Sequence, residues 1–199
     1  MSFAKIFKAL TDRRNYFCCQ REYMFRQRLS KNSESPVLPE TRETSLTVIK
    51  TPEEANALIS AGFDLGNCPF LDNAKKWLGK GVILFLIFFG KTLAHSSQVS
   101  TGNYDALSET IFRNIRYENT GYIGPCYTSP PYRGRGLYPF ALLKICEFLR
   151  ENGKEQAVIS TKKNNDSSVK GIQKASFEFT AEVLNIKLLL WRFCKIYEK

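Results

Sequence analysis

The residues best suited to chemistry lie in the run Tyr127–Leu137, where two glycines are separated by one residue. Gly134 and Gly136 allow successive backbone N–H groups to turn toward one point, and the positive end of a following helix adds attraction for an anion. Arg133 and Arg135 bring further positive charge beside them. If the run joins a strand to a helix, this pattern predicts a cradle for a diphosphate.

The sequence on both sides agrees with a strand-to-helix junction. Residues 120–128 are rich in β-formers, and their glycines and proline are typical of a bulged or splayed strand. Downstream, Pro139 suits the first turn of a helix, and Gly153 suits its C-terminal end. Apolar residues recur between them at helical spacing, namely Leu142, Ile145, Cys146 and Leu149. We therefore expect a strand, a glycine-rich turn and a helix.

The run resembles the cofactor motif of the GNAT superfamily of acetyl-CoA-dependent N-acetyltransferases, Val-x-Pro-x-x-Arg-Gly-x-Gly-hydrophobic. The matching positions are Thr128, Pro130, Arg133, Gly134, Arg135, Gly136 and Leu137, with Pro131 where the family usually has Gln or Arg. A second family element, Asn-x-x-Ala/Ser-x-x-x-Tyr-x-Lys-x-Gly-Phe, is matched by Asn165, Ser168, Ile172, Lys174, Ser176 and Phe177. Ile172 and Ser176 depart from the family's Tyr and Gly. The resemblance covers residues 43 to 199.

The resemblance implies one α/β domain, a GNAT-like fold with a mixed, mostly antiparallel central sheet that splays at the cofactor site and is flanked by helices. We expect residues 43–199 to form this domain and residues 1–42 to form a basic N-terminal extension and linker. The patterns predict strands at 45–49, 82–89, 92–99 and 157–160, the last beside the cradle strand, and a final strand at 188–193. A capping box at Thr51–Glu54 predicts a helix ending at Gly62.

Composition limits the partners and the compartment. The 199 residues carry a net charge of +10, which favours an anionic partner such as a coenzyme, a sugar nucleotide, a nucleic acid or a lipid surface. The six cysteines include no C-x-x-C pair and only one histidine accompanies them, so we expect no metal site. The lysine-interrupted N-terminus lacks a signal core, and the apolar run 82–89 is too short for a transmembrane segment, so we expect a cytoplasmic protein.

The resemblance also implies a set of cofactor-binding residues for acetyl-CoA. The pantetheine amides would bond the strand backbone at Cys126, Tyr127 and Thr128. The pyrophosphate would lie on the N–H groups of Arg133, Gly134, Arg135, Gly136, Leu137 and Tyr138. Asn165 and Ser168 would meet the pantetheine from the next strand-to-helix junction. Asn165 is equally suited to capping the helix that begins at Asp166.

In the resembling family a neutral amine attacks the thioester directly, which requires a proton acceptor and a proton donor. The family's donor tyrosine is replaced by Ile172, and the cradle strand has no glutamate. We consider three substitutes: His95 as base, Tyr127 as proton donor to sulfur, and Glu118 acting through water. Each residue also has an ordinary alternative role. His95 suits a structural position, Tyr127 suits packing, and Glu118 suits a solvated charge. Cys126 lacks a nearby histidine in sequence and suits a small buried apolar role.

The acceptor is less constrained than the coenzyme. Polar residues at 95–98 and 102–105 suit a small amine, and our first expectation is an amino-sugar nucleotide of cell-surface polysaccharide synthesis. A protein amine or an aminoacyl-tRNA is the next candidate, and a binding module that kept acetyl-CoA affinity without turnover stays open. A protein that binds nucleic acid through residues 133–136 is disfavoured, because no aromatic-flanked recognition motif is present. A homodimer is compatible with the sequence.

Overall fold

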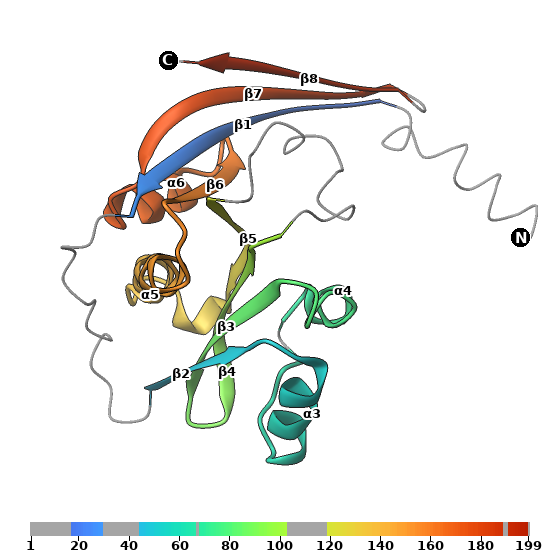
Figure 1. Cartoon of the computed structure of the whole chain (residues 1–199), viewed down its shortest axis with the longest axis vertical. Coiled ribbons are helices and arrows are strands. Elements are labelled where there is room, and N and C mark those ends of the chain that lie inside the picture. The colour runs from blue at the N-terminus through green and yellow to red at the C-terminus, as the bar shows by residue number, and fades with distance from the viewer. Residues whose placement is uncertain (1–16, 30–43, 67, 103–118, 189–190, 199) are drawn as a thin grey trace, which may run out of the picture.

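The computed structural model describes residues 17–29, 44–66, 68–102, 119–188 and 191–198. Eight strands form one open sheet in the order β2-β3-β4-β5-β6-β1-β7-β8 (Figure 1). The strands are β1 (Phe17–Arg28), β2 (Thr44–Ile49), β3 (Val82–Phe89), β4 (Thr92–Ser100), β5 (Thr120–Thr128), β6 (Gln156–Lys162), β7 (Glu178–Leu188) and β8 (Trp191–Glu198). The helices are α3 (Pro52–Ser60), α4 (Leu71–Lys75), η1 (Pro130–Tyr132), α5 (Leu137–Glu151) and α6 (Asp166–Lys174).

The sheet is mixed. β5 and β6 pair in parallel, and the other neighbouring strands pair antiparallel. The parallel pair is joined by α5, because a chain that returns to the same end of a sheet needs a crossover. This confirms the predicted single α/β domain, with a mixed and mostly antiparallel sheet flanked by helices.

Several local predictions are confirmed. The apolar run 82–89 is β3, an interior strand whose residues are buried except for Phe89. Thr51 caps α3 through the predicted capping box, with its hydroxyl accepting from the N–H of Glu54. The strands at 92–99 and 157–160 also form, the latter beside the cradle strand as expected.

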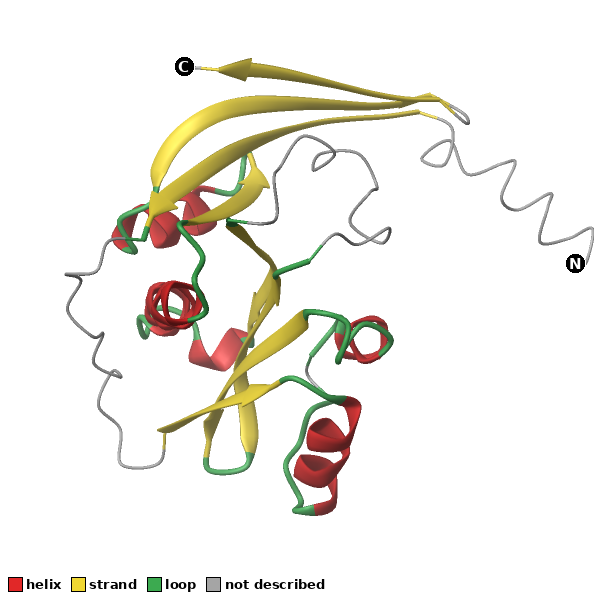
Figure 2. Ribbon diagram, viewed as in Figure 1, coloured by secondary structure: helices red, strands yellow, loops and turns green. Residues whose placement is uncertain are grey.

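Helices cover both faces of the sheet (Figure 2). On one face, which we call the α5 face, Phe85, Ile123 and Ile159 pack against α5 and α6. On the opposite face, alternate residues of β3 such as Leu84 and Leu86 pack with residues of α3 and α4. Because successive side chains of a strand point to opposite faces, β3 supplies both cores and is apolar throughout.

A strand from the N-terminal part of the chain lies inside the sheet. β1 pairs antiparallel with β6 along one edge and with β7 along the other, and Phe25 is buried in the α5-face core. Figure 1 shows β1, β7 and β8 curving together beyond the helices. The division between residues 42 and 43 stays a prediction about folding units, and the sheet contains strands from both sides of it.

The C-terminal prediction needs a correction. We expected one final strand at 188–193, whereas the structure has two antiparallel strands, β7 ending at Leu188 and β8 beginning at Trp191. An apolar run of this kind is typical of the middle of a strand, but here Leu188 and Trp191 pair across the reversal of a hairpin. In the part of the chain that the structure describes, no helix has the length and apolar character needed to cross a membrane.

The sheet opens between β5 and β6. Their parallel pairing runs from Thr120 and Gln156 to Ile123 and Ile159 and then stops, although both strands continue. The rest of β5 stays paired with β4, where Cys126 and Thr128 lie opposite Ser97 and His95. The edge of β5 that faces β6 is therefore left without a strand partner from Gly124 onward, as the splayed-strand prediction required.

Candidate active site

A cavity of about 780 Å³ lies where β5 and β6 separate. Its wall combines the end of β5, the glycine turn, the start of α5, and α6. It includes residues from both faces of the sheet, since Ile159 packs on the α5 face and its neighbour Ser160 points the other way. The splay therefore connects the two faces of the sheet through one cavity.

The glycine turn forms an open cradle at the start of α5. Gly134 and Gly136 have φ of 76° and 75°, a left-handed conformation that other residues rarely adopt. Gly136 is the N-cap of α5, and no side chain caps the helix there. The first N–H groups of a helix have no intrahelical partner, so they are available to an anion in the cavity. A Cβ at Gly134 would meet no atom within 4 Å, which leaves the turn accessible.

The two arginines of the turn lie differently from each other. The Nε of Arg133 donates to the carbonyl oxygen of Thr128 at 3.1 Å, which fixes its guanidinium beside the end of β5. The guanidinium of Arg135 lies 5.5 Å from the ring centroids of both Phe89 and Tyr132, outside the cavity wall. Arg133 thus adds positive charge at the cavity, and Arg135 contributes its backbone while its side chain stacks on aromatic rings.

Asn165 and Ser168 lie where the second motif placed them, at the start of α6 in the cavity wall. The Oδ1 of Asn165 accepts from the backbone N–H of Ser168 at 3.2 Å, so Asn165 caps the helix. The same Oδ1 also accepts from the hydroxyl of Ser167. The capping alternative is therefore confirmed, and a contact with pantetheine stays a prediction.

Tyr138 has a side chain in the cavity whose role the sequence did not reveal. We expected only its backbone to matter, yet its hydroxyl lies 3.3 Å from the Oγ of Ser168. Its ring packs over Gly171 of α6, where a Cβ would lie 2.5 Å from the ring Cδ1. Burial raises the pKa of Tyr138 well above its ordinary value, so the phenol stays protonated. The available signal was a tyrosine in the first turn of α5 and a glycine in the middle of α6.

His95 is buried, with 1% of its surface exposed. Its Nδ1 lies 2.7 Å from the Oγ1 of Thr128 and its Nε2 lies 2.8 Å from the Oγ of Ser97. Burial lowers the pKa of His95 to about 3, because the charged imidazolium would lose its hydration. Both ring nitrogens thus have partners and the ring stays neutral, which favours a positioning role for His95 over proton acceptance.

The other two candidates do not join His95. Tyr127 lines the cavity, but the side chain that contacts His95 belongs to the next residue, Thr128. Because successive side chains of a strand alternate, the side chain of Tyr127 points to the face opposite His95. Glu118 lies outside the described residues. Burial raises the pKa of the Cys126 thiol to about 12, which suits the small apolar role expected of it. The three proposed catalytic groups are therefore not shown to form one constellation.

The comparisons with known proteins agree on the family that this chain is similar to. Residues 103–177 match the model of the acetyltransferase (GNAT) family. A GNAT-family acetyltransferase from Colwellia psychrerythraea shares the fold with a TM-score of 0.52 and 16% identity, over 100% of this chain and 64% of that one. One from Novosphingobium aromaticivorans gives a TM-score of 0.52 and 14% identity, over 84% and 63%.

A fungal structure described as a glucosamine N-acetyltransferase region of a multi-domain β-N-acetylglucosaminidase gives a TM-score of 0.59 and 12% identity. This chain is covered over 98% of its length and the fungal chain over 23%. At these identities the likeness concerns the fold, and this chain spans less than two thirds of the length of each of these proteins. No curated protein matches the sequence. The matched family model, the shared fold and the glycine cradle at the splayed strands all make this chain similar to the GNAT superfamily of acetyltransferases.

Proposed function

We propose that the protein transfers an acetyl group from acetyl-CoA to an amine of a small molecule, with an amino-sugar nucleotide as the first candidate. One observation carries the proposal. The open edge of β5 and the uncapped start of α5 face a single cavity. An extended chain of amides suits the strand edge, and a diphosphate suits the helix N-terminus. Acetyl-CoA combines these two groups in that order.

The residues of the cavity have separate tasks in this proposal. The N–H groups of residues 134–138 hold the pyrophosphate, and Arg133 balances its charge from the end of β5. The free edge of Cys126 and Tyr127 orients the pantetheine amides. Bound there, acetyl-CoA supplies an activated acyl group. Among the described residues no three His, Cys, Asp or Glu side chains are grouped to hold a metal ion, and the absence of a metal stays an expectation.

The nature of the amine rests on charge and polarity. The net charge of +10 favours an acceptor that carries phosphate, and a nucleotide-linked sugar satisfies this requirement. Polar side chains such as Tyr127, Ser160 and Thr161 line the cavity and suit a hydroxylated compound. The fungal neighbour described as acting on glucosamine shows that this fold accommodates an amino sugar in that protein. A protein amine and an aminoacyl-tRNA are the alternatives.

Calorimetry with acetyl-CoA tests the coenzyme site. The double variant Gly134→Asp, Gly136→Asp places side chains and negative charge in the cradle, so we expect it to abolish binding that is micromolar in the native chain. Gly153→Asp is the matched control, since Gly153 also has a positive φ, of 74°, and open space, but lies beyond the other end of α5. Equal backbone strain without loss of binding would tie the effect to the cradle.

Turnover is then measured as release of free thiol, with glucosamine, a nucleotide-linked amino sugar, a peptide α-amine and aminoacyl-tRNA as acceptors. Faster release with the amino sugars supports the proposal. Faster release with the peptide or the tRNA moves the function to those alternatives. Binding without release for any acceptor identifies a coenzyme-binding module, and no binding by the folded native chain removes the acetyltransferase proposal.

A further inference from the structure

The described site lacks a carboxylate on its central strand, because β5 contains no Asp or Glu. The structure supplies one from elsewhere in the chain. Glu22 of β1 is held by two hydrogen bonds, from the Nε2 of Gln20 at 2.7 Å and from the Oγ of Ser160 at 3.0 Å. Ser160 belongs to β6 and lines the cavity. The inserted strand therefore connects a carboxylate to the cavity wall.

The connection continues to β5. The hydroxyl of Tyr122 lies 3.3 Å from the Oγ of Ser160, and Tyr122 also lines the cavity. Three polar groups from three adjacent strands thus form the series Tyr122, Ser160, Glu22. Each member can accept a proton from the one before it and donate to the one after it, and the carboxylate at the end is the strongest acceptor.

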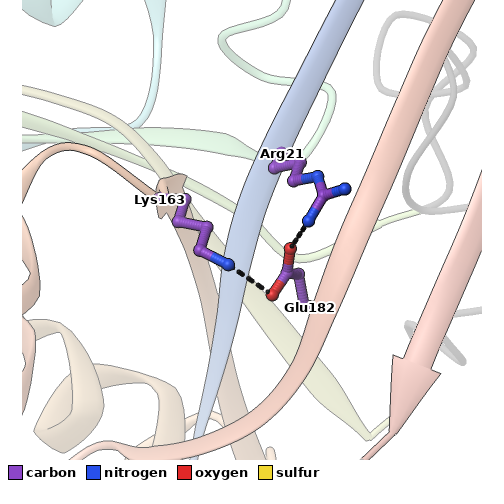
Figure 3. Close-up of polar contacts among 3 residues, drawn as sticks. All are labelled: Arg21, Lys163 and Glu182. Carbon is purple, nitrogen blue, oxygen red and sulfur yellow. Dashed lines mark hydrogen bonds and ion pairs between the residues drawn. The ribbon is translucent and has the colours of Figure 1, made fainter.

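All three side chains lie on the sheet face away from α5. Their neighbours Ile123 and Ile159 pack in the α5-face core, and alternation along a strand sends Tyr122 and Ser160 the other way. Arg21, the residue before Glu22, points to the opposite face of the sheet by the same alternation. In Figure 3, Arg21 points with Lys163 toward Glu182, and the three form ion pairs. Glu182 and Glu22 are thus carboxylates of adjacent strands on opposite faces.

A second polar group on this face lacks a partner. Asn185 of β7 lies opposite Gln20 in register, so both share the face of Glu22. The Oδ1 of Asn185 is buried and has no hydrogen-bond partner among the described residues. A buried carbonyl without a donor is costly, so the face that carries Glu22 also holds an unsatisfied hydrogen-bond acceptor.

We propose that Tyr122, Ser160 and Glu22 form the proton-accepting relay for the acceptor amine, with β1 supplying the base. This rests on the proposed acetyl transfer. As the C–N bond forms and the C–S bond breaks, the amine proton passes to the Tyr122 oxygen. The Tyr122 proton passes to Ser160, and the Ser160 proton passes to the Glu22 carboxylate and from there to water. The coenzyme sulfur leaves as thiolate and takes a proton from solvent. Tyr122 touches the substrate, and Ser160 and Glu22 act through it.

The decisive variants are Glu22→Gln, Ser160→Ala and Tyr122→Phe, each compared with Glu182→Gln. Glu182 has the same chemistry on the next strand but faces away from the relay, so Glu182→Gln should retain native turnover. A positioned base contributes on the order of a hundredfold, so we expect that loss in kcat for Glu22→Gln, with KM for acetyl-CoA unchanged. Ser160→Ala and Tyr122→Phe should lower kcat in the same way.

The pH profile of kcat separates a base from a structural role. A carboxylate must be ionised to accept the proton, so native kcat should fall at low pH, and this acidic limb should be absent in Glu22→Gln. Glu22→Asp should keep the limb at lower kcat. The titratable groups beside Glu22 are Tyr122 across Ser160, Lys162 of β6 opposite it in register, and Cys194 of β8. A limb that persists in Glu22→Gln would assign it to another group and overturn the proposal.

Kinetics use the four acceptors of the turnover measurement and acetyl-CoA hydrolysis without amine, and the fastest of these reactions serves for all variants. Acetyl-CoA affinity is measured by calorimetry in parallel. Native binding without turnover in any of these reactions overturns the relay while leaving the coenzyme site in place. Absence of native binding overturns the proposed function itself. Equal kcat and equal pH profiles for Glu22→Gln and the native chain also overturn the relay.

Discussion

At the scale of single residues, burial decides what the polar groups around the cavity can do. His95 has the side-chain type of a general base, but it is buried on the α5 face with hydroxyl groups on both ring nitrogens. Glu22 has no motif around it, but its carboxylate reaches the cavity through a serine. Residue type suggested the first and missed the second, because only the paired strands show which side chains meet.

The neutral state of His95 makes stability depend on pH. The pKa is about 3 in the folded protein and near its ordinary 6.5 when unfolded, so between these values only the unfolded chain binds the proton. The free energy of unfolding should therefore fall as pH decreases below about 6.5, by up to about 1.4 kcal/mol per pH unit from this residue. Urea unfolding at pH 7 and pH 5 measures it. His95→Gln should lack this part of the loss, and an equal pH dependence in both proteins contradicts the prediction.

The contact between Gly171 and Tyr138 predicts a coupled pair of substitutions. Gly171→Ala places a methyl group 2.5 Å from the Tyr138 ring, so we expect a loss of about 1 to 3 kcal/mol in the free energy of unfolding. In the Tyr138→Ala background the space is open, and the same change should stabilise α6 by up to about 1 kcal/mol. Thermal and urea unfolding of the four proteins give the coupling. Identical effects of Gly171→Ala in both backgrounds would show that the ring is not held there.

At the scale of elements, β1 pairs with strands that are far from it in the sequence. It separates β6 from β7, and its Phe25 is packed among α5-face residues. Removing a strand from this position would expose the edges of both neighbours as well as apolar core. We therefore expect β1 to contribute to the stability of the whole sheet, as a peripheral extension would not.

Phe25→Ala tests how much β1 contributes to stability. Phe25 is 1% exposed, so we expect a loss of about 3 to 5 kcal/mol in the free energy of unfolding, in a single transition of the whole sheet. Phe179→Ala is the control, since Phe179 contacts Phe25 edge-on from the next strand but is 36% exposed and should cost less. Differential scanning calorimetry distinguishes the cases. An unchanged main transition in Phe25→Ala would mean that β1 unfolds separately.

The elements also show which features a sequence can predict. The turn at Gly134 and Gly136, the apolar run of β3 and the cap of α3 follow from local patterns, because neighbouring residues determine them. The place of β1 does not, because the order of strands is set by pairings between residues far apart in sequence. The hairpin after Leu188 was missed for another reason. The residues from Leu188 to Trp191 are all apolar, so no Gly, Pro, Asn or Asp marked a turn there.

At the scale of the whole molecule, charge should govern coenzyme binding. The chain has 29 Lys and Arg against 19 Asp and Glu, and acetyl-CoA carries several phosphate charges. Raising the salt concentration from about 50 mM to about 500 mM shortens the Debye length, so we expect several-fold weaker binding by calorimetry. S-acetylpantetheine, which lacks the phosphates, is the control and should bind with little salt dependence. Equal sensitivity of both ligands would contradict an electrostatic contribution at the cradle.

The position of β1 also sets an order of events during synthesis. Glu22 pairs with Lys162, which the ribosome adds 140 positions later, and the other edge of β1 waits for β7. At a typical rate of roughly 5 to 20 residues per second, β1 stays without its partners for about 7 to 30 seconds. The nascent chain therefore presents an unpaired strand with Phe25 exposed until most of the domain has left the ribosome. Protection of that segment by a chaperone would matter more for the yield of folded protein than for its final stability.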